Sequence, residues 1–165
     1  MKNSRENLGG STRAIDSVVV HHTGSRILRD FDSPLLVKLR HRFLKGWDNV
    51  GYHYLIGNGR LTEDGKIYDG RPIEMPGAHA FGHNKNSIGI AMIGNFDHSK
   101  PTDKQMATLS QLLVKLCGDY GLGADAIRGH RELEYAKTAC PGKYVDMDSV
   151  RTAVTTSLPS SVVRC

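Results

Sequence analysis

AIDSVVVHH, at residues 14–22, is the stretch of sequence that decides the fold class. Its short β-branched run ends in two histidines and is typical of a buried strand. A second apolar stretch, SIGIAMIG at residues 87–94, has the same character, and helix-type patterns lie before and after it. Strands that alternate with helices predict an α/β (α+β) class, a single domain in which a central mixed β-sheet is flanked by helices.

Capping residues and hydrophobic periodicity define the other elements. Ser33 and Pro34 are typical of a helix start, and Gly46 is a suitable end for that helix. The remaining predictions are a strand at residues 52–56, a long surface loop at 72–86, a short strand at 126–130 and a last helix at 146–157. Long loops without regular structure are often functional, so residues 72–86 are of interest.

The clearest helix prediction covers residues 102–118. Its apolar residues share one helical face, which is the pattern of a helix that packs on a sheet. Thr102 and Gln105 have the spacing of a capping box at its start. Gly118 and Gly121 are the predicted stop signals at its end.

Length and composition are those of an ordinary globular domain. The chain has 165 residues, of which 39% are apolar and 24% charged, which excludes collagen-like, coiled-coil and disordered classes. No apolar stretch approaches the roughly 20 residues of a membrane helix, so we expect no membrane insertion. The first residues are polar and show no secretory signal, so we expect synthesis in the cytoplasm without a signal peptide.

Charge favours an anionic partner without defining one. The chain carries 22 Lys and Arg against 17 Asp and Glu, a net charge of +5. The basic residues are scattered, and neither a basic stripe nor an aromatic platform is visible, so no nucleic acid is expected as a partner. The sequence does not define the oligomeric state, for which a monomer is favoured.

The cysteines do not form a disulfide framework. An odd number of cysteines without a secretory signal argues against one. Cys117 lies in the helical apolar pattern and is expected to be a small buried hydrophobe, whereas Cys165 ends the chain and is expected to be frayed. Cys140 lies in loop-like sequence, ten residues after His130.

His130 and Cys140 are of the ligand types that zinc prefers. Together with one distant histidine they would supply three ligands and leave a fourth position for water, as in catalytic zinc sites. Only one residue of the pair His21 and His22 can face a given site, because adjacent strand residues point to opposite faces. Two alternatives stay open: His130 and Cys140 are unrelated loop residues, or Cys140 is a nucleophile with a histidine as its base.

Four motifs, in order along the chain, carry a family resemblance. They are VHHT at residues 20–23, GW…VGYH at 46–53, His79…NSIG ending at residue 89, and His130…ACPG ending at residue 142. Together they resemble the type 2 N-acetylmuramoyl-L-alanine amidases, above all the small phage lysozymes of that family, with the peptidoglycan recognition proteins as relatives. The resemblance covers roughly residues 14–155 and implies a central mixed sheet with a zinc site in a surface cleft.

The resemblance also implies roles for individual residues. One Zn²⁺ per chain would be held by His21, His130 and Cys140, so that His22 points away. Tyr52, in the Gly-Tyr-His motif, would assist catalysis, and His79 would contact the substrate. Thr138 stands where some phage members carry a lysine, and as a catalytic residue it would donate a second hydrogen bond.

These expectations lead to one functional hypothesis and two alternatives. The hypothesis is a zinc-dependent, endolysin-like amidase that cuts the amide between N-acetylmuramic acid and L-alanine in bacterial peptidoglycan and so acts on the cell wall. The alternatives are a peptidoglycan-binding module without catalysis and a cell-wall peptidase with Cys140 as nucleophile. The expected organisation is a flexible N-terminal arm at residues 1–13, an amidase catalytic domain at 14–157 and a C-terminal tail at 158–165.

Overall fold

The computed structural model of this chain describes residues 13–26, 30–45 and 50–158. Four sequence predictions lie outside these residues in whole or nearly so: the N-terminal arm at 1–13, the helix end at Gly46, the C-terminal tail at 158–165 and the frayed Cys165.

The centre of the fold is one mixed five-stranded sheet with the order β3-β2-β4-β1-β5. The strands β2, β4, β1 and β5 run parallel, and the edge strand β3 is antiparallel to its neighbour β2. The mixed sheet predicted from the sequence is therefore confirmed. Its strands are β1 (Ser17–His22), β2 (Tyr54–Ile56), β3 (Ile67–Asp69), β4 (Ser87–Met92) and β5 (Ile127–Gly129).

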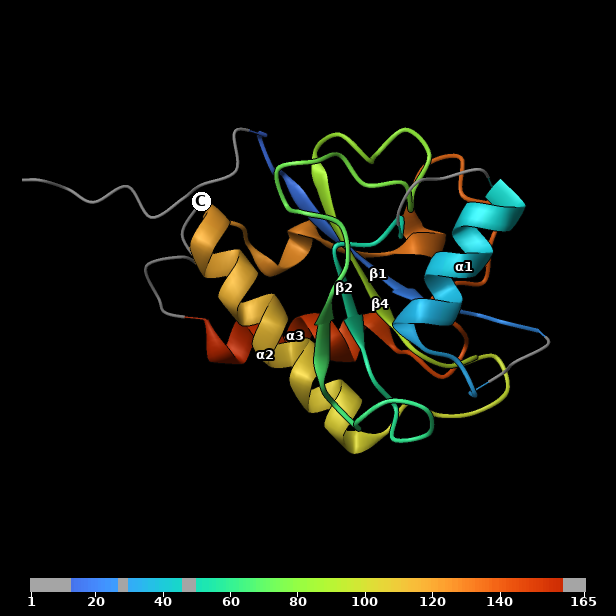
Figure 1. The fold of residues 1–165 in the computed structure, drawn as a ribbon. Coiled ribbons are helices and arrows are strands. Elements are labelled where there is room, and N and C mark those ends of the chain that lie inside the picture. The colour runs from blue at the N-terminus through green and yellow to red at the C-terminus, as the bar shows by residue number, and fades with distance from the viewer. Residues whose placement is uncertain (1–12, 27–29, 46–49, 159–165) are drawn as a thin grey trace, which may run out of the picture.

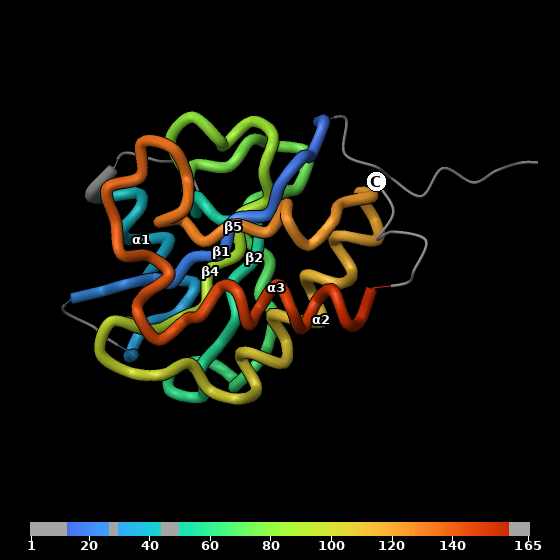
Figure 2. The backbone as a smooth tube through the Cα atoms, turned by 180° about the vertical axis from the view of Figure 1, so that it is seen from behind, coloured from blue at the N-terminus to red at the C-terminus, as the bar shows by residue number. Residues whose placement is uncertain are grey.

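Helices cover both faces of the sheet. The helices α2 (Asp103–Tyr120) and α3 (Met147–Ser157) pack together on one face, and α1 (Pro34–Lys45) lies on the other (Figures 1 and 2). Two short 3₁₀ turns, η1 (Ala124–Ala126) and η2 (His130–Glu132), flank β5. No helix in the described part of the chain combines the length and apolar character needed to span a membrane.

The alternation of side chains along β1 explains which residues reach which layer. Val18 and Val20 belong to the large core beneath α2 and α3. Val19 and His21, which alternate with them along the strand, point to the opposite face. His21 is therefore on the α1 side, in register with Ala91 of β4, whose other neighbour, Leu55, packs with Val37 of α1. This alternation separates the apolar core from the face that carries the histidine.

The boundaries of α2 confirm one prediction and correct another. Thr102 and Gln105 form the predicted capping box. The helix continues to Tyr120, so the prediction that Gly118 stops it is wrong. Gly121 ends the helix because it adopts the left-handed conformation, with φ 65°, and its N–H bonds to the Cys117 carbonyl. Cys117 is fully buried, as predicted.

The strand predicted at residues 52–56 is shorter in the structure. The strand β2 begins at Tyr54, and the carbonyls of Tyr52 and His53 before it accept backbone hydrogen bonds from Arg71 and Gly70, just beyond β3. The predicted loop at residues 72–86 contains no helix or strand. It carries His79, whose ring lies against His21 in the site described next.

Candidate metal centre

The three predicted ligands converge where β1 and β5 end. His21 is near the end of β1, and His130 directly follows β5, the parallel neighbour of β1. Both residues therefore lie at the end of the sheet where these strands have their carboxyl ends. Cys140 reaches the same point from the loop after η2. One potential ligand atom from each of these residues lies within 4.8 Å of the other two. The structure thus brings together residues that are 119 positions apart in the chain.

The spacing of these atoms fits a zinc ion. His21 Nδ1 and Cys140 Sγ are 3.6 Å apart. Tetrahedral zinc, with Zn–N near 2.05 Å and Zn–S near 2.3 Å, requires an N to S separation of about 3.6 Å. The donor set of two imidazoles and one thiol is also of the type that zinc prefers. The separation of His21 and Cys140 and the chemistry of the three side chains therefore fit this ion.

The environment of Cys140 suits a metal ligand better than a free nucleophile. Its Sγ is buried and accepts the backbone N–H of His22 at 3.4 Å. Burial raises the pKa of the thiol to about 12. Without a neighbouring cation the thiol would stay protonated at neutral pH, whereas metal coordination removes that proton. This favours the ligand interpretation over the nucleophile alternative.

The two adjacent histidines face different surroundings. The His22 ring accepts the backbone N–H of Phe96 at its Nδ1, 3.1 Å away, and so points away from the cluster. The His21 ring is 1% exposed, and burial together with the nearby imidazoles lowers its pKa well below the ordinary value. His21 is therefore neutral at physiological pH, which is the form that binds metals.

Tyr52, Thr138 and His79 surround the three predicted ligands. The Tyr52 ring lies 5.1 Å from the His21 ring, and burial raises its pKa, so the phenol keeps its proton. Thr138 Oγ1 accepts the Cys140 N–H at 3.1 Å, which leaves the hydroxyl proton for donation. Thr138 and His130 line a pocket of about 160 Å³. His79 Nδ1 lies 3.0 Å from His21 Nε2.

Sequence reasoning missed Arg131, which connects two of the ligand segments. Its backbone N–H donates to the Cys140 carbonyl at 2.7 Å. Its guanidinium donates to the carbonyls of Gly142 and Val145, both at 2.8 Å. Arg131 therefore ties the turn that carries His130 to the loop that carries Cys140. The only signal in the sequence was its position next to a predicted ligand.

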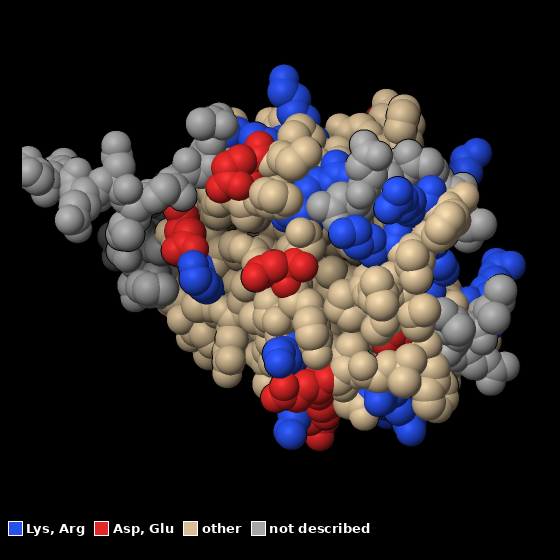
Figure 3. All heavy atoms as spheres, in the orientation of Figure 1, with Lys and Arg blue, Asp and Glu red and all other residues tan. Residues whose placement is uncertain are grey.

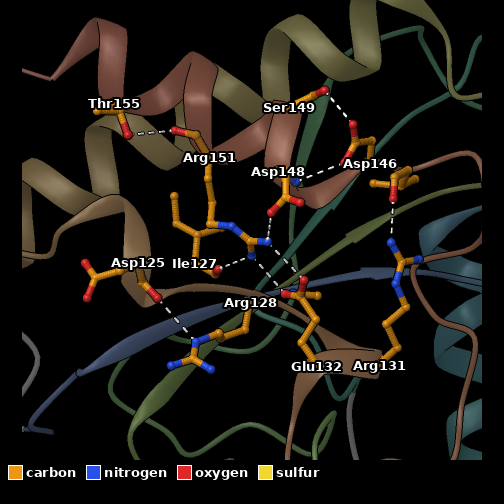
Figure 4. Close-up of polar contacts among 12 residues, drawn as sticks. Asp125, Ile127, Arg128, Arg131, Glu132, Asp146, Asp148, Ser149, Arg151 and Thr155 are labelled. Carbon is orange, nitrogen blue, oxygen red and sulfur yellow. Dashed lines mark hydrogen bonds and ion pairs between the residues drawn. The ribbon is translucent and has the colours of Figure 1, made fainter.

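Glu132 anchors the same turn to α3. Its carboxylate accepts the Gly129 N–H at 2.7 Å. It also pairs with Arg151 through both carboxylate oxygens, at 2.9 and 3.1 Å (Figure 4). The hydrogen bonds from Arg151 lower the pKa of Glu132. Arg151 also binds Asp148 and the Ile127 carbonyl, so β5, η2 and α3 share one polar network.

Fold and site together define a single-domain α/β protein with a three-residue candidate metal centre at the edge of its sheet. Residues 11–143 match the family model described as N-acetylmuramoyl-L-alanine amidase. This match covers most of the chain, and the chain therefore belongs to the N-acetylmuramoyl-L-alanine amidase family. The resemblance found in the sequence motifs is confirmed.

Individual relatives agree with this family. The chain is 39% identical over 102 residues to the endolysin of Escherichia phage T7, covering 59% of this chain and 62% of the endolysin. It is 35% identical over 104 residues to the human N-acetylmuramoyl-L-alanine amidase, covering 62% of this chain but only 17% of the human protein. The chain thus spans only a small part of that relative.

Solved structures share the fold over nearly the whole chain. The amidase LysC from Clostridium intestinale has a TM-score of 0.75 and 28% identity, covering 91% of this chain and 90% of that one. A complex of tracheal cytotoxin with the ectodomains of the peptidoglycan recognition proteins LCa and LCx has a TM-score of 0.67 and 31% identity, covering 83% of this chain and 81% of that one.

Proposed function

We propose that this protein is a zinc-dependent amidase that hydrolyses the amide bond between N-acetylmuramic acid and the L-alanine of the stem peptide in peptidoglycan. The observation that carries the proposal is the convergence of His21, His130 and Cys140, whose potential ligand atoms lie within 4.8 Å of one another, with a His21 to Cys140 separation that suits tetrahedral zinc. Residues 14–157 form the catalytic domain. Family membership supports the reaction, and the ligand geometry supports the metal dependence.

Each residue of the site has a distinct part in this proposal. His21, His130 and Cys140 hold the ion, which when bound supplies a Lewis acid that lowers the pKa of water and polarises a carbonyl. The Tyr52 phenol, whose pKa desolvation raises further above neutral pH, keeps its proton and donates a hydrogen bond to the attacking water or to the developing oxyanion. Thr138, exposed beside the pocket, donates a second one.

The partner in this proposal is bacterial peptidoglycan. A similar solved structure contains peptidoglycan recognition proteins with tracheal cytotoxin, which supports a cell-wall ligand. The net charge of +5 suits an anionic wall polymer. On the face seen in Figure 3, Lys and Arg concentrate on the side where α1 lies, while most Asp and Glu lie toward α2. The predicted contact of His79 with the substrate stays a prediction.

The test is digestion of purified cell walls followed by mass spectrometry of the released fragments. The proposal expects stem peptides with a free L-alanine amino group, no release in the presence of a chelator, and recovery when zinc is added back. Release that survives chelation but stops with iodoacetamide would replace the zinc mechanism by a Cys140 nucleophile. Wall binding without any release would identify a recognition module.

A further inference from the structure

The buried imidazole of His79 makes a direct contact with the predicted ligand His21. His79 Nδ1 lies 3.0 Å from His21 Nε2, and the two rings meet nearly at right angles, with centroids 5.0 Å apart. The other nitrogen of His21, Nδ1, is the one that faces Cys140 Sγ. The two nitrogens of His21 are therefore divided between the candidate metal position and His79.

The protein provides a close-fitting socket for the His79 ring. A Cβ atom on Gly77 would lie 2.3 Å from His79 Cδ2, and one on Gly89 would lie 2.5 Å from the same atom. Real Cβ atoms do not approach other atoms so closely, so neither position accepts a side chain while the ring stays in place. Gly89 lies in β4, in register with Val19 of β1, on the sheet face that also carries His21.

The loop around His79 holds the ring in this socket. The backbone N–H groups of His79 and Ala80 both donate to Asn84 Oδ1, at 2.7 and 2.9 Å. The N–H of Gly77 donates to the Asn84 carbonyl at 3.1 Å. Asn84 thus fixes the part of the loop that carries the imidazole, and these hydrogen bonds hold the ring in contact with His21.

We propose that His79 is a positioning residue for the metal ligand His21. By accepting the Nε2–H of His21, it selects the neutral tautomer in which the Nδ1 lone pair points toward Cys140. It also fixes the rotation of the His21 ring, as outer partners of metal-binding histidines commonly do. The inference rests on the proposed metal site but not on the bond that the enzyme cuts.

The experiment compares two variants in zinc affinity, measured by competition with a chromophoric chelator. His79→Leu removes the acceptor at similar volume, and we expect a loss of about 10- to 100-fold. His79→Asn keeps an oxygen acceptor near the place of Nδ1 and should stay within a few-fold of the wild type. Absorption spectra of the cobalt-loaded proteins should shift for the leucine variant and much less for the asparagine variant.

A second pair of variants covers the case in which His79→Leu does not fold. Gly89→Ala forces the ring out of its socket without touching a ligand, and zinc affinity should fall. Gly118→Ala is the matched control, because a Cβ there meets nothing within 4 Å, and its affinity should be unchanged.

Three outcomes would overturn the inference: unchanged affinity in His79→Leu, equal loss in the leucine and asparagine variants, or unchanged affinity in Gly89→Ala. Failure of the proposed metal site is distinguishable from these outcomes, because the wild type itself would then bind no zinc. Failure of the proposed reaction alone would leave zinc binding, and so this test, unchanged.

Discussion

Replacing Arg131 with alanine should weaken both the fold and the metal site. The guanidinium donates two hydrogen bonds of 2.8 Å to the carbonyls of Gly142 and Val145, both of which are buried residues. A hydrogen bond from a charged donor contributes about 1.5–3 kcal/mol. Arg131 is half-buried, so in the alanine variant water can replace part of the lost hydrogen bonding. We therefore expect the free energy of unfolding to fall by about 3 kcal/mol.

The effect on zinc affinity follows from where these bonds lie. Arg131 connects the turn that carries His130 to the loop that carries Cys140, so its removal lets the two ligands move relative to each other. Loss of such outer contacts typically lowers metal affinity by about 10-fold or more. Arg131→Lys keeps the charge but cannot span both carbonyls with one ammonium group, so it should lie between the wild type and the alanine variant.

The assays are urea unfolding of the metal-free protein and zinc binding by chelator competition. Arg128→Ala is the matched control, because it removes the same charge from an exposed neighbour with one side-chain hydrogen bond of 3.2 Å to the Asp125 carbonyl. We expect the control to change stability by less than about 0.5 kcal/mol. If Arg131→Ala matched the control in both assays, the bridge between the two ligand segments would have no energetic role.

Three further outcomes are expected. Cys140→Ser should keep the fold by circular dichroism but lose most of its bound zinc, and full zinc content with full activity would remove Cys140 from the ligand set. Tyr52→Phe should keep the metal and slow wall hydrolysis, and an unchanged rate would remove Tyr52 from the mechanism. Burial lowers the pKa of His53 to about 4, so between pH 6.5 and 4 this residue binds more protons in the unfolded chain than in the folded one. The stability of the metal-free protein should therefore fall from pH 6.5 to 4, by up to about 1.4 kcal/mol per pH unit from this residue, and urea titrations of His53→Gln should show a shallower slope.

Elements with local signals were predictable from the sequence. The β-branched run before His21 marks β1, and the capping box marks the start of α2, because propensity and capping act within a few residues. The end of α2 was not predictable in the same way. Gly118 and Gly121 are both plausible stop signals, and only the backbone conformation shows that Gly121 takes the left-handed geometry.

The proposed ligand set could be predicted from the family motifs, but the residues that support it could not. His21, His130 and Cys140 belong to residue types that zinc prefers, so their chemistry is visible in the sequence. The contacts of His79 and Arg131 depend on the path of the loops that carry them, and no local pattern encodes that path. A loop histidine and an arginine beside a ligand remain ambiguous until the tertiary structure places their acceptors and donors.

The contacts that position the three proposed ligands differ in kind, because the sheet holds the backbone of one ligand and not that of the other two. His21 lies on β1, which pairs with β4 on one side and β5 on the other, so its backbone is already held by the sheet. What remains is the rotation and tautomer of its ring, and those are what a hydrogen bond to His79 can set. His130 and Cys140 follow β5 in a turn and a loop, outside the strands of the sheet. Their supports accordingly act on the backbone: Arg131 on the carbonyls around Cys140, and Glu132 on the turn that contains His130. The same reasoning predicts that a change at His79 alters the cobalt spectrum more than stability, whereas a change at Arg131 alters both.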